Sequence, residues 1–267
     1  MRYEKFKALY DKLNDYSDVK KLAEETGLDE EFLNVIYTQK TVRAATKRYH
    51  VIRRNAPRLL REWRKGSSFL SLAQQWNFPP ILIGLILFQE NGYSKKQFWK
   101  HVHDPNSIKD PRLRKEIIEI TAADTIYSPE GNEIQHKRGI WGEEKLQEWL
   151  EEQELTYQDE DELRGKYSKT PDCLLDEPIK INGQTIHWIE SKASFGDRIE
   201  FNRNIRSQLA QYVEMFGPGM VVYWFGHLDN LDCPPGIEII DASLSKIDCQ
   251  KADVDFCPEE LPSSLNV

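Results

Sequence analysis

Hydrophobic residues recur at helical spacing through the first 125 residues, with few of the alternations that mark strands. One pattern occurs twice: Leu22-Ala23-x3-Gly27-Leu28 returns fifty residues later as Leu72-Ala73-x3-Asn77-Phe78, and an apolar helical pattern follows each copy. Gly27 and Asn77 tolerate the left-handed conformation that ends many helices. We expect Asp29 to cap the helix after the first turn, and Pro80 to start the helix after the second. The pattern predicts helix-turn-helix pairs, which occur in DNA-binding proteins and also as ordinary αα-hairpins in bundles.

The pattern changes near Tyr127-Ser128-Pro129-Glu130-Gly131-Asn132, where turn-forming residues gather. A helix follows, and then β-prone runs separated by Asn-Gly and Gly-Pro-Gly. We therefore predict an α+β protein with two domains. Residues 1–127 form an all-α, helix-turn-helix-like domain, and residues 128–267 form an α/β domain that ends in a loose tail of fifteen residues.

Two β-prone runs flank the turn signal Asn182-Gly183, which predicts a β-hairpin. In the second strand Trp188, Glu190 and Lys192 alternate with other residues and so share one face. Charged residues are costly in the middle of an apolar strand unless they interact with something. Asp172, at the start of the first strand, completes a set of two carboxylates and a lysine.

This set fits metal-dependent phosphodiester hydrolysis. Carboxylate oxygens are suitable ligands for Mg²⁺ or Mn²⁺. The metal lowers the pKa of a bound water and stabilises charge on the phosphate. A neighbouring lysine positions the nucleophile or stabilises the transition state. The alternative is a purely structural salt bridge.

The hairpin needs an irregularity for this set to form. A strict two-residue turn sets Asp172 opposite Ala193, on the face away from Glu190 and Lys192. A three-residue connection, or a bulge near Glu177-Pro178, restores the shared face. We expect one of the two.

A proline-free helix beginning near Gly139 carries another carboxylate. Glu143 lies three residues before Leu146 and seven before Leu150, on the face that these leucines define. A carboxylate directed towards a core needs a partner or a metal, unless it reaches water at the edge of the apolar stripe.

These motifs resemble the signature of the PD-(D/E)xK nucleases. Pro171-Asp172 followed by Glu190-Ser191-Lys192 is similar to the signature itself, and Gly139-x3-Glu143 resembles the glutamate motif that precedes it. Gln208-x3-Tyr212 resembles a helix motif of RecB-like and Holliday-junction-resolvase-like members. Glutamine and tyrosine four residues apart share a helix face, and they would contact phosphate or steady the lysine. The order of helix, hairpin, helix and strand is that of a restriction-endonuclease-like core.

Longer segments narrow the resemblance. Lys169–Asp172, Ile186–Asp197 and Phe216–Gly219 resemble the TPD-motif family, which includes archaeal proteins and the animal codanin-interacting nuclease. The resemblance implies a metal-dependent nuclease that uses Mg²⁺ or Mn²⁺. The catalytic residues that it implies are Asp172, Glu190, Lys192 and Glu143. The implied metal ligands are Asp172, Glu190 and the backbone carbonyl of Ser191, with Glu143 as an auxiliary ligand. The implied supporting residues are Gln208 and Tyr212.

The charge distribution bears on the substrate. The net charge of −8 argues against nucleic acid at first sight. However, residues 1–130 hold 23 Lys and Arg against 17 Asp and Glu, while residues 131–267 hold 13 against 27. The stretch Lys40–Lys65 has ten basic residues and one acid, which indicates a phosphate-binding surface or a solvated helix face. The candidate nucleic-acid-binding residues are Arg43, Lys47, Arg48, Arg53, Arg54 and Arg58.

We therefore expect a nuclease that hydrolyses DNA, with selectivity for branched or otherwise structured DNA left open. The alternatives are a DNA-binding or adaptor protein with a vestigial nuclease core, and a nuclease that acts on RNA. A codanin-like partner is expected only if the chain comes from the animal branch, and a homodimer stays open. Without a signal-peptide pattern or membrane span we expect an intracellular protein, cytoplasmic in a prokaryote or nuclear and cytoplasmic in a eukaryote.

Two further predictions concern single side chains. Asp197, just beyond the second hairpin strand, is a candidate to support the site. Cys233, Cys249 and Cys257 would cluster around zinc only with help from a histidine, whereas Cys173 is expected to be buried in its strand.

Overall fold

The computed structural model describes residues 1–247 and 249–251, and it divides into two compact units. The first, here called the sheet unit, comprises Met1–Lys12, Leu28–Val35 and the chain from Arg138 onward. The second, the helical unit, comprises Leu13–Gly27 and Ile36–Lys137. This division differs from the predicted boundary between residues 127 and 128, because helix α9 (Pro129–Glu152) continues through the change in composition. The predicted loose tail, 253–267, lies outside the described residues.

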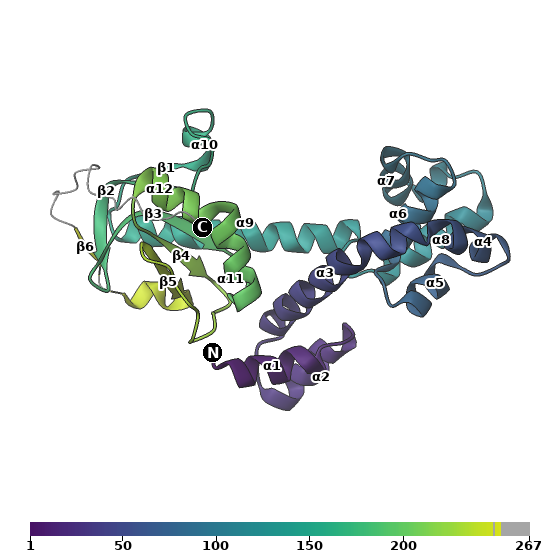
Figure 1. The fold of residues 1–267 in the computed structure, drawn as a ribbon, viewed down its shortest axis with the longest axis horizontal. Helices are drawn as coiled ribbons and strands as arrows, with labels where there is room; N and C mark the ends of the chain where they lie inside the picture. Colours follow the sequence, from purple (N-terminus) through teal and green to yellow (C-terminus); the bar gives the residue numbers. More distant parts are fainter. Residues whose placement is uncertain (248, 252–267) are drawn as a thin grey trace. The chain divides into compact units, whose positions relative to one another are not determined.

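The helical unit is built around helix α6 (Pro80–Glu90), which is buried along nearly its whole length. The remaining helices are α2 (Ser17–Thr26), most of α3 (Glu30–Arg54), α4 (Ala56–Arg64), α5 (Phe69–Trp76), α7 (Lys95–His103), the 3-10 helix η1 (Pro105–Ser107), α8 (Pro111–Ala123) and the start of α9 (Figure 1).

The local helix signals in the sequence are confirmed. Gly27 and Asn77 adopt left-handed conformations, with φ of 68° and 44°, where α2 and α5 end. Pro80 is the first residue of α6. The Asp29 carboxylate accepts a hydrogen bond of 2.9 Å from the Phe32 N–H and caps α3.

The second repeat is an αα-hairpin inside a bundle, which was the alternative to a DNA-reading pair. A recognition helix must present polar side chains to a groove. In α6, Ile81 and every residue from Ile83 to Phe88 are buried. This helix therefore supplies core contacts and has no face of that kind.

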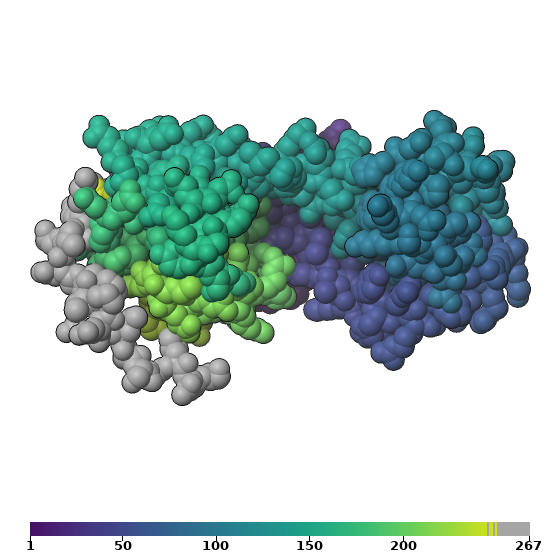
Figure 2. All heavy atoms as spheres, turned by 90° about the horizontal axis from the view of Figure 1, so that it is seen from above, coloured from purple at the N-terminus to yellow at the C-terminus, as the bar shows by residue number. Residues whose placement is uncertain are grey.

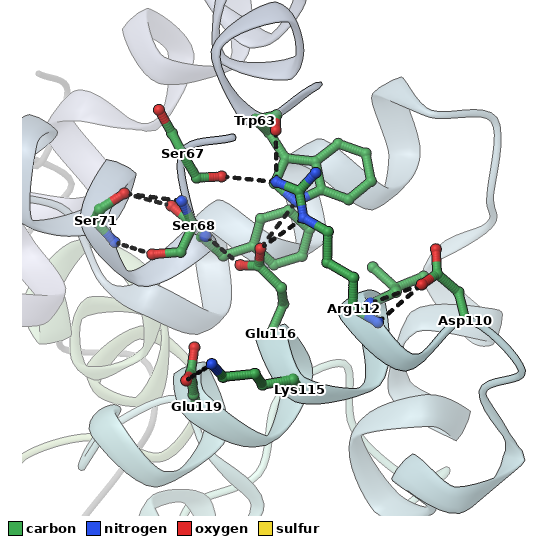
Figure 3. Close-up of polar contacts among 11 residues, drawn as sticks. Trp63, Ser67, Ser68, Ser71, Asp110, Arg112, Lys115, Glu116 and Glu119 are labelled. Carbon is green, nitrogen blue, oxygen red and sulfur yellow. Dashed lines mark hydrogen bonds and ion pairs between the residues drawn. The ribbon is translucent and has the colours of Figure 1, made fainter. Parts of the chain in front are cut away.

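A buried carboxylate joins α8 to the loop between α4 and α5 (Figure 3). Glu116 accepts hydrogen bonds from the Phe69 N–H at 2.5 Å and the Trp63 indole at 3.2 Å. Arg112 forms an ion pair with Glu116 and donates to the Trp63 and Ser67 carbonyls at 2.6 and 3.1 Å. Because a buried charge must be compensated, these contacts define one conformation of the loop.

The sheet unit contains a mixed sheet with strand order β1-β2-β3-β4-β5, and β6 pairs with β2. β2 pairs antiparallel with β1, β3 and β6, whereas β3–β4 and β4–β5 are parallel. The strands are β1 (Tyr157–Asp159), β2 (Cys173–Ile181), β3 (Gln184–Lys192), β4 (Gly219–Tyr223), β5 (Ile237–Asp241) and β6 (Gln250–Lys251). The other elements of this unit are α1 (Tyr3–Lys12), α10 (Glu160–Leu163), α11 (Arg198–Asn204), the π-helical turn η2 (Ile205–Leu209), α12 (Ala210–Phe216) and the 3-10 helix η3 (Ala242–Lys246).

Helices cover both faces of this sheet (Figure 1). Leu146 and Leu150 of α9 pack with Ile189 on one face. Trp188 packs with Tyr212 of α12 on the other, with ring centroids 5.2 Å apart. Since β3 side chains alternate, Glu190 and Lys192 share the α12 face with Trp188, as the sequence predicted.

Two N-terminal segments complete the sheet unit. Phe6 of α1 stacks on Phe195 at 5.0 Å, and Phe32 meets the same ring edge-on at 5.8 Å. Arg138 pairs with Glu31, with a distance of 2.7 Å from Nε to Oε1. These segments therefore belong with the predicted second domain, although they are far from it in sequence.

Over the part of the chain that the structure describes, no helix is long and apolar enough to cross a membrane.

Candidate active site

The register of the hairpin changes within β2, and this change assembles the site. Ile181 pairs with Gln184 across a two-residue turn, but beyond an irregularity between Leu174 and Ile179, Cys173 pairs with Ile189. The pairing shifts by three residues, an odd number, which exchanges the two faces of the strand. The predicted bulge near Glu177-Pro178 is thereby confirmed.

The shift sets Asp172 beside Glu190. The Ser191 N–H donates to Asp172 Oδ2 at 2.7 Å, and the Asp172 N–H donates to Glu190 Oε2 at 3.3 Å. Lys192 Nζ forms an ion pair with Glu190 Oε1. The structure therefore brings together three of the predicted catalytic residues at the carboxyl end of β3.

Burial makes the two carboxylates hard to ionise together. Burial and the neighbouring Asp172 raise the pKa of Glu190 to about 7, although the Lys192 charge opposes the shift. Burial also raises the pKa of Asp172, against the Lys192 charge and the Ser191 N–H. Two close carboxylates in a low-dielectric site favour a shared proton or a bound cation.

The main chain offers another oxygen on the same side. The Trp224 N–H donates to the Lys192 carbonyl, so the main-chain groups of Lys192 face β4. Consecutive residues in a strand direct these groups to opposite edges, and the Ser191 N–H does point to Asp172. The Ser191 carbonyl is therefore directed to the Asp172 edge, beyond the start of β2.

The donors fit a hard divalent cation. Two carboxylates and a carbonyl oxygen are the ligand types that Mg²⁺ and Mn²⁺ prefer, with water completing the shell. Within residues 1–247 and 249–251, no three His, Cys, Asp or Glu side chains form a ready-made metal cluster. The described side chains would therefore supply only part of the coordination shell of such a cation.

Glu143 is exposed at the edge of the α9 stripe, whereas Leu146 and Leu150 are buried. It lines a pocket of about 290 Å³ together with Asp172 and with Asp159, Glu160 and Asp161 of the β1–α10 segment. The structure therefore places Glu143 in the same pocket as Asp172.

A neighbouring glycine was missed by the sequence reasoning. A Cβ on Gly142 would lie 2.8 Å from Trp224 Cδ1 and 3.1 Å from Ser191 Oγ, whereas a Cβ on Gly139 would meet nothing within 4 Å. The Trp224 indole donates to Ser191 Oγ at 2.8 Å. Gly142 thus lets α9 approach the end of β3. In the sequence, only its position next to Glu143 indicated that it lies near the site.

Tyr212 holds the loop that carries Asp172. Its buried hydroxyl donates to the Thr170 carbonyl at 2.6 Å, and the Gln208 amide lies 3.4 Å from the same hydroxyl. Gln208 lies in η2, and π-helical turns of this kind are frequent at functional sites. The motif Gln208-x3-Tyr212 therefore acts on the position of Asp172 through the loop.

Asp197 caps helix α11. Its carboxylate accepts hydrogen bonds of 2.9 Å from both the Ile199 and the Glu200 N–H groups. The structure thus gives this predicted supporting residue a local role in starting the helix.

The candidate nucleic-acid-binding residues differ in what they contact. Arg48 donates to the Trp76 and Asn77 carbonyls, at 2.5 and 2.6 Å, and so caps the end of α5. Arg58 pairs with Glu62 at 2.8 Å. The remaining candidates, Arg43, Lys47, Arg53 and Arg54, lie along α3, and of these Lys47, Arg53 and Arg54 are exposed.

Cys173 is buried in β2 as predicted. The Cys233 thiol donates to the Ile237 carbonyl at 2.8 Å. The zinc hypothesis also involves Cys257, which lies outside the described residues, and it stays untested.

These observations define a mixed α+β protein with paired carboxylates and a lysine at the end of a central strand. The model of the family described as "Protein of unknown function TPD sequence-motif" matches residues 109–243, which is half of the chain. The chain belongs to this TPD sequence-motif family.

Curated relatives carry a more specific name. The protein called CDAN1-interacting nuclease 1 is 38% identical over 172 residues in Danio rerio, covering 61% of this chain and 57% of that protein. In Homo sapiens it is 37% identical over 172 residues, covering 61% of each chain. The matched region is thus less than two thirds of these relatives' own length. No solved structure matches the chain.

Proposed function

We propose that this protein is a divalent-metal-dependent nuclease with a PD-(D/E)xK, restriction-endonuclease-like core that hydrolyses phosphodiester bonds in DNA. The observation that carries the proposal is the convergence of Asp172, Glu190 and Lys192 at the end of β3. The relatives' name, which includes the word nuclease, supports the same activity.

The site residues have distinct roles in this proposal. Asp172, Glu190 and the Ser191 carbonyl hold the cation, with Glu143 as an auxiliary ligand. A bound Mg²⁺ or Mn²⁺ would supply an activated water and neutralise charge on the phosphate. Lys192 orients the water or stabilises the developing negative charge on the phosphate oxygens.

The chain prepares this arrangement in advance. The Ser191 N–H and the strand register orient Asp172, and Lys192 holds one Glu190 oxygen, so little reorganisation is needed when substrate binds. Tyr212 limits movement of the loop before Asp172.

DNA is proposed as the substrate because basic residues gather on α3 and α4 of a chain whose net charge is −8. Lysine and arginine side chains bind phosphates without reading bases. RNA presents the same phosphates, so the assay must include it.

A panel of labelled single-stranded, duplex and branched DNAs, with single-stranded RNA, tests the activity in Mg²⁺ or Mn²⁺. We expect metal-dependent cleavage that EDTA abolishes. Asp172→Ala and Lys192→Ala should each reduce the rate at least about a hundredfold, on the scale of losing one transition-state contact. If the variants cleave as fast as the wild type, the assigned site is wrong.

The relatives' name also contains the word interacting, which keeps an adaptor role as the second candidate. A chain with a vestigial core would bind DNA or protein without cleaving. Absence of cleavage by the wild type in every metal, with DNA binding retained, would favour that candidate. Codanin binding is attached to the animal relatives by their name, and it is not proposed for this chain.

A further inference from the structure

A short basic segment leads into the site. Residues 164–169, with the sequence Arg-Gly-Lys-Tyr-Ser-Lys, contain three cations and no acid, in the half of the chain with 27 Asp and Glu against 13 Lys and Arg. Arg164 is paired with Glu160 and Asp161 of α10. Among the described residues, Lys169 and the nearby Arg206 form no ion pair.

This segment is held against η2 and α12. Lys169 Nζ donates to the Ser207 carbonyl at 2.8 Å, which sets Lys169 next to the exposed Arg206. Tyr167 packs on Phe216 with ring centroids 4.9 Å apart and planes at 77°. Lys169 and Tyr167 are therefore held against the elements that contain Ser207 and Phe216, and Arg206 precedes Ser207 in η2. Lys169, Arg206 and Tyr167 are here called the basic strip.

The basic strip lies on the same side of the sheet as the reactive groups. Glu190 and Lys192 point to the α12 face with Trp188, and η2 and α12 cover that face. The opposite side of Asp172 is acidic, since Asp159, Glu160 and Asp161 line the pocket there. Figure 2 shows green surface from the middle of the sheet unit's sequence adjoining the yellow-green surface of α11 to α12. This asymmetry favours a nucleic-acid strand that approaches the site from the strip.

Tyr167 adds a base-binding element. Tyr167 is 44% exposed although its ring packs on Phe216. An exposed aromatic ring among cations is the usual platform for single-stranded nucleic acid, because a base stacks on the ring while cations contact the backbone. Bases inside a duplex are already stacked and cannot use it.

We propose that the basic strip binds an unpaired strand of nucleic acid, with Tyr167 stacking on a base and Lys169 and Arg206 contacting phosphates, and that it leads this strand to Lys192. The proposal rests on the proposed nuclease function and specifies its substrate as single-stranded DNA or an unpaired end.

Binding is measured separately from cleavage. Fluorescence anisotropy of a labelled 15-nucleotide oligothymidine, and of a duplex of the same length, is recorded for the full chain in EDTA at several salt concentrations. Tyr167→Ala should weaken single-strand binding about tenfold, the scale of one stacked base, while Tyr167→Phe keeps wild-type affinity. Duplex affinity should change less than twofold in both variants.

The phosphate contacts have their own readout. Lys169→Gln and Arg206→Gln should each lower the slope of log affinity against log salt by about 0.7 for the single strand. Lys169→Arg should keep the slope, because the charge is retained. Lys7→Gln, an exposed lysine on α1 of the same unit, is the matched control and should leave both slope and affinity unchanged.

The outcomes separate the two proposals. Unchanged single-strand affinity in Tyr167→Ala, unchanged salt slopes in the glutamine variants, or no single-strand binding by the wild type each overturns the basic strip. If the variants behave as expected but the wild type cleaves no substrate in any metal, the strip stands and the nuclease proposal fails.

Discussion

At the scale of single residues, the site depends on a buried carboxylate pair that one cation, Lys192, only partly neutralises. Glu190 is buried, and its pKa is raised to about 7 by burial and by Asp172. A group in this state stays protonated over part of the physiological range. The metal binding that we propose would therefore compete with a proton.

The affinity for Mn²⁺ should consequently depend on pH. Below about pH 7 Glu190 carries a proton that the metal must displace, so affinity should rise by up to tenfold per pH unit and level off above it. Calorimetric titration with Mn²⁺ at pH 5.5, 6.5, 7.5 and 8.5 measures this. In Asp172→Asn the like charge is removed, so the residual dependence should move to lower pH. A constant wild-type affinity over this range would contradict the assigned environment of Glu190.

The hydroxyl of Tyr212 offers a second test at this scale. Tyr212→Phe removes the hydrogen bond to the Thr170 carbonyl and should lower the free energy of unfolding by about 1 kcal/mol. Because the loop then holds Asp172 less firmly, Mn²⁺ affinity should fall about tenfold, as for other residues that orient ligands.

Tyr223→Phe is the matched control for Tyr212→Phe. The Tyr223 hydroxyl accepts a bond of 2.8 Å from the Asn204 amide and has no contact with Thr170. We expect a similar loss of stability with unchanged metal affinity. Equal effects of the two variants on metal affinity would refute the positioning role of Tyr212.

At the scale of elements, the approach of α9 to the end of β3 decides where Glu143 and Ser191 lie. The two faces of the sheet are packed by different helices, and α9 carries Gly139 and Gly142 three residues apart. A Cβ at Gly142 would contact neighbouring side chains, whereas a Cβ at Gly139 would not. Alanine substitution at these two positions therefore separates the effect of packing on the free energy of unfolding from the effect of helix propensity.

Gly142→Ala should lower the free energy of unfolding by about 1–3 kcal/mol, since its Cβ would overlap Trp224 and Ser191. Gly139→Ala, three residues earlier on α9, should be neutral or stabilise by up to about 1 kcal/mol, because alanine is the better helix former. Urea unfolding followed by tryptophan fluorescence measures both. Equal effects would mean that α9 does not approach β3 this closely.

At the scale of the whole molecule, charge is distributed unevenly between the two units. Basic residues are concentrated in the helical unit along α3 and α4, and acidic residues in the second half of the chain. Arg43, Lys47 and Arg54 are spaced by four and seven residues, so they share one face of α3. Such a face would bind phosphates without sequence preference.

Removing charge from this face should weaken DNA binding in a salt-dependent way. The double variant Lys47→Gln, Arg54→Gln should lower the salt slope for duplex DNA by about two, with an unchanged thermal midpoint. Arg48→Gln should instead lower the thermal midpoint, because Arg48 holds the carbonyls at the end of α5. Fluorescence anisotropy measures the salt slope and thermal melts measure the midpoint of both variants. An unchanged salt slope in the double variant would mean that these basic residues face solvent and do not contact DNA.

The features that were predictable from the sequence are those that local rules control. The turns at Gly27 and Asn77, the start of α6 at Pro80 and the need for a bulge before Asp172 all follow from backbone conformation or from the two-residue period of strands. The convergence of the two carboxylates was predictable for the same reason. A hairpin whose pairing shifts by an even number of residues, or not at all, would leave Asp172 and Glu190 on opposite faces.

The long-range contacts, in contrast, follow from how the elements pack in three dimensions. Local sequence patterns do not specify that Tyr212 bonds to Thr170, that Gly142 meets Trp224, or that Phe6 stacks on Phe195. The apolar pattern of α6 is visible in the sequence, but it fits a buried helix of a bundle and a helix of a DNA-binding pair equally well. Contacts between residues distant in sequence depend on how whole elements pack, and packing is a property of the assembled core.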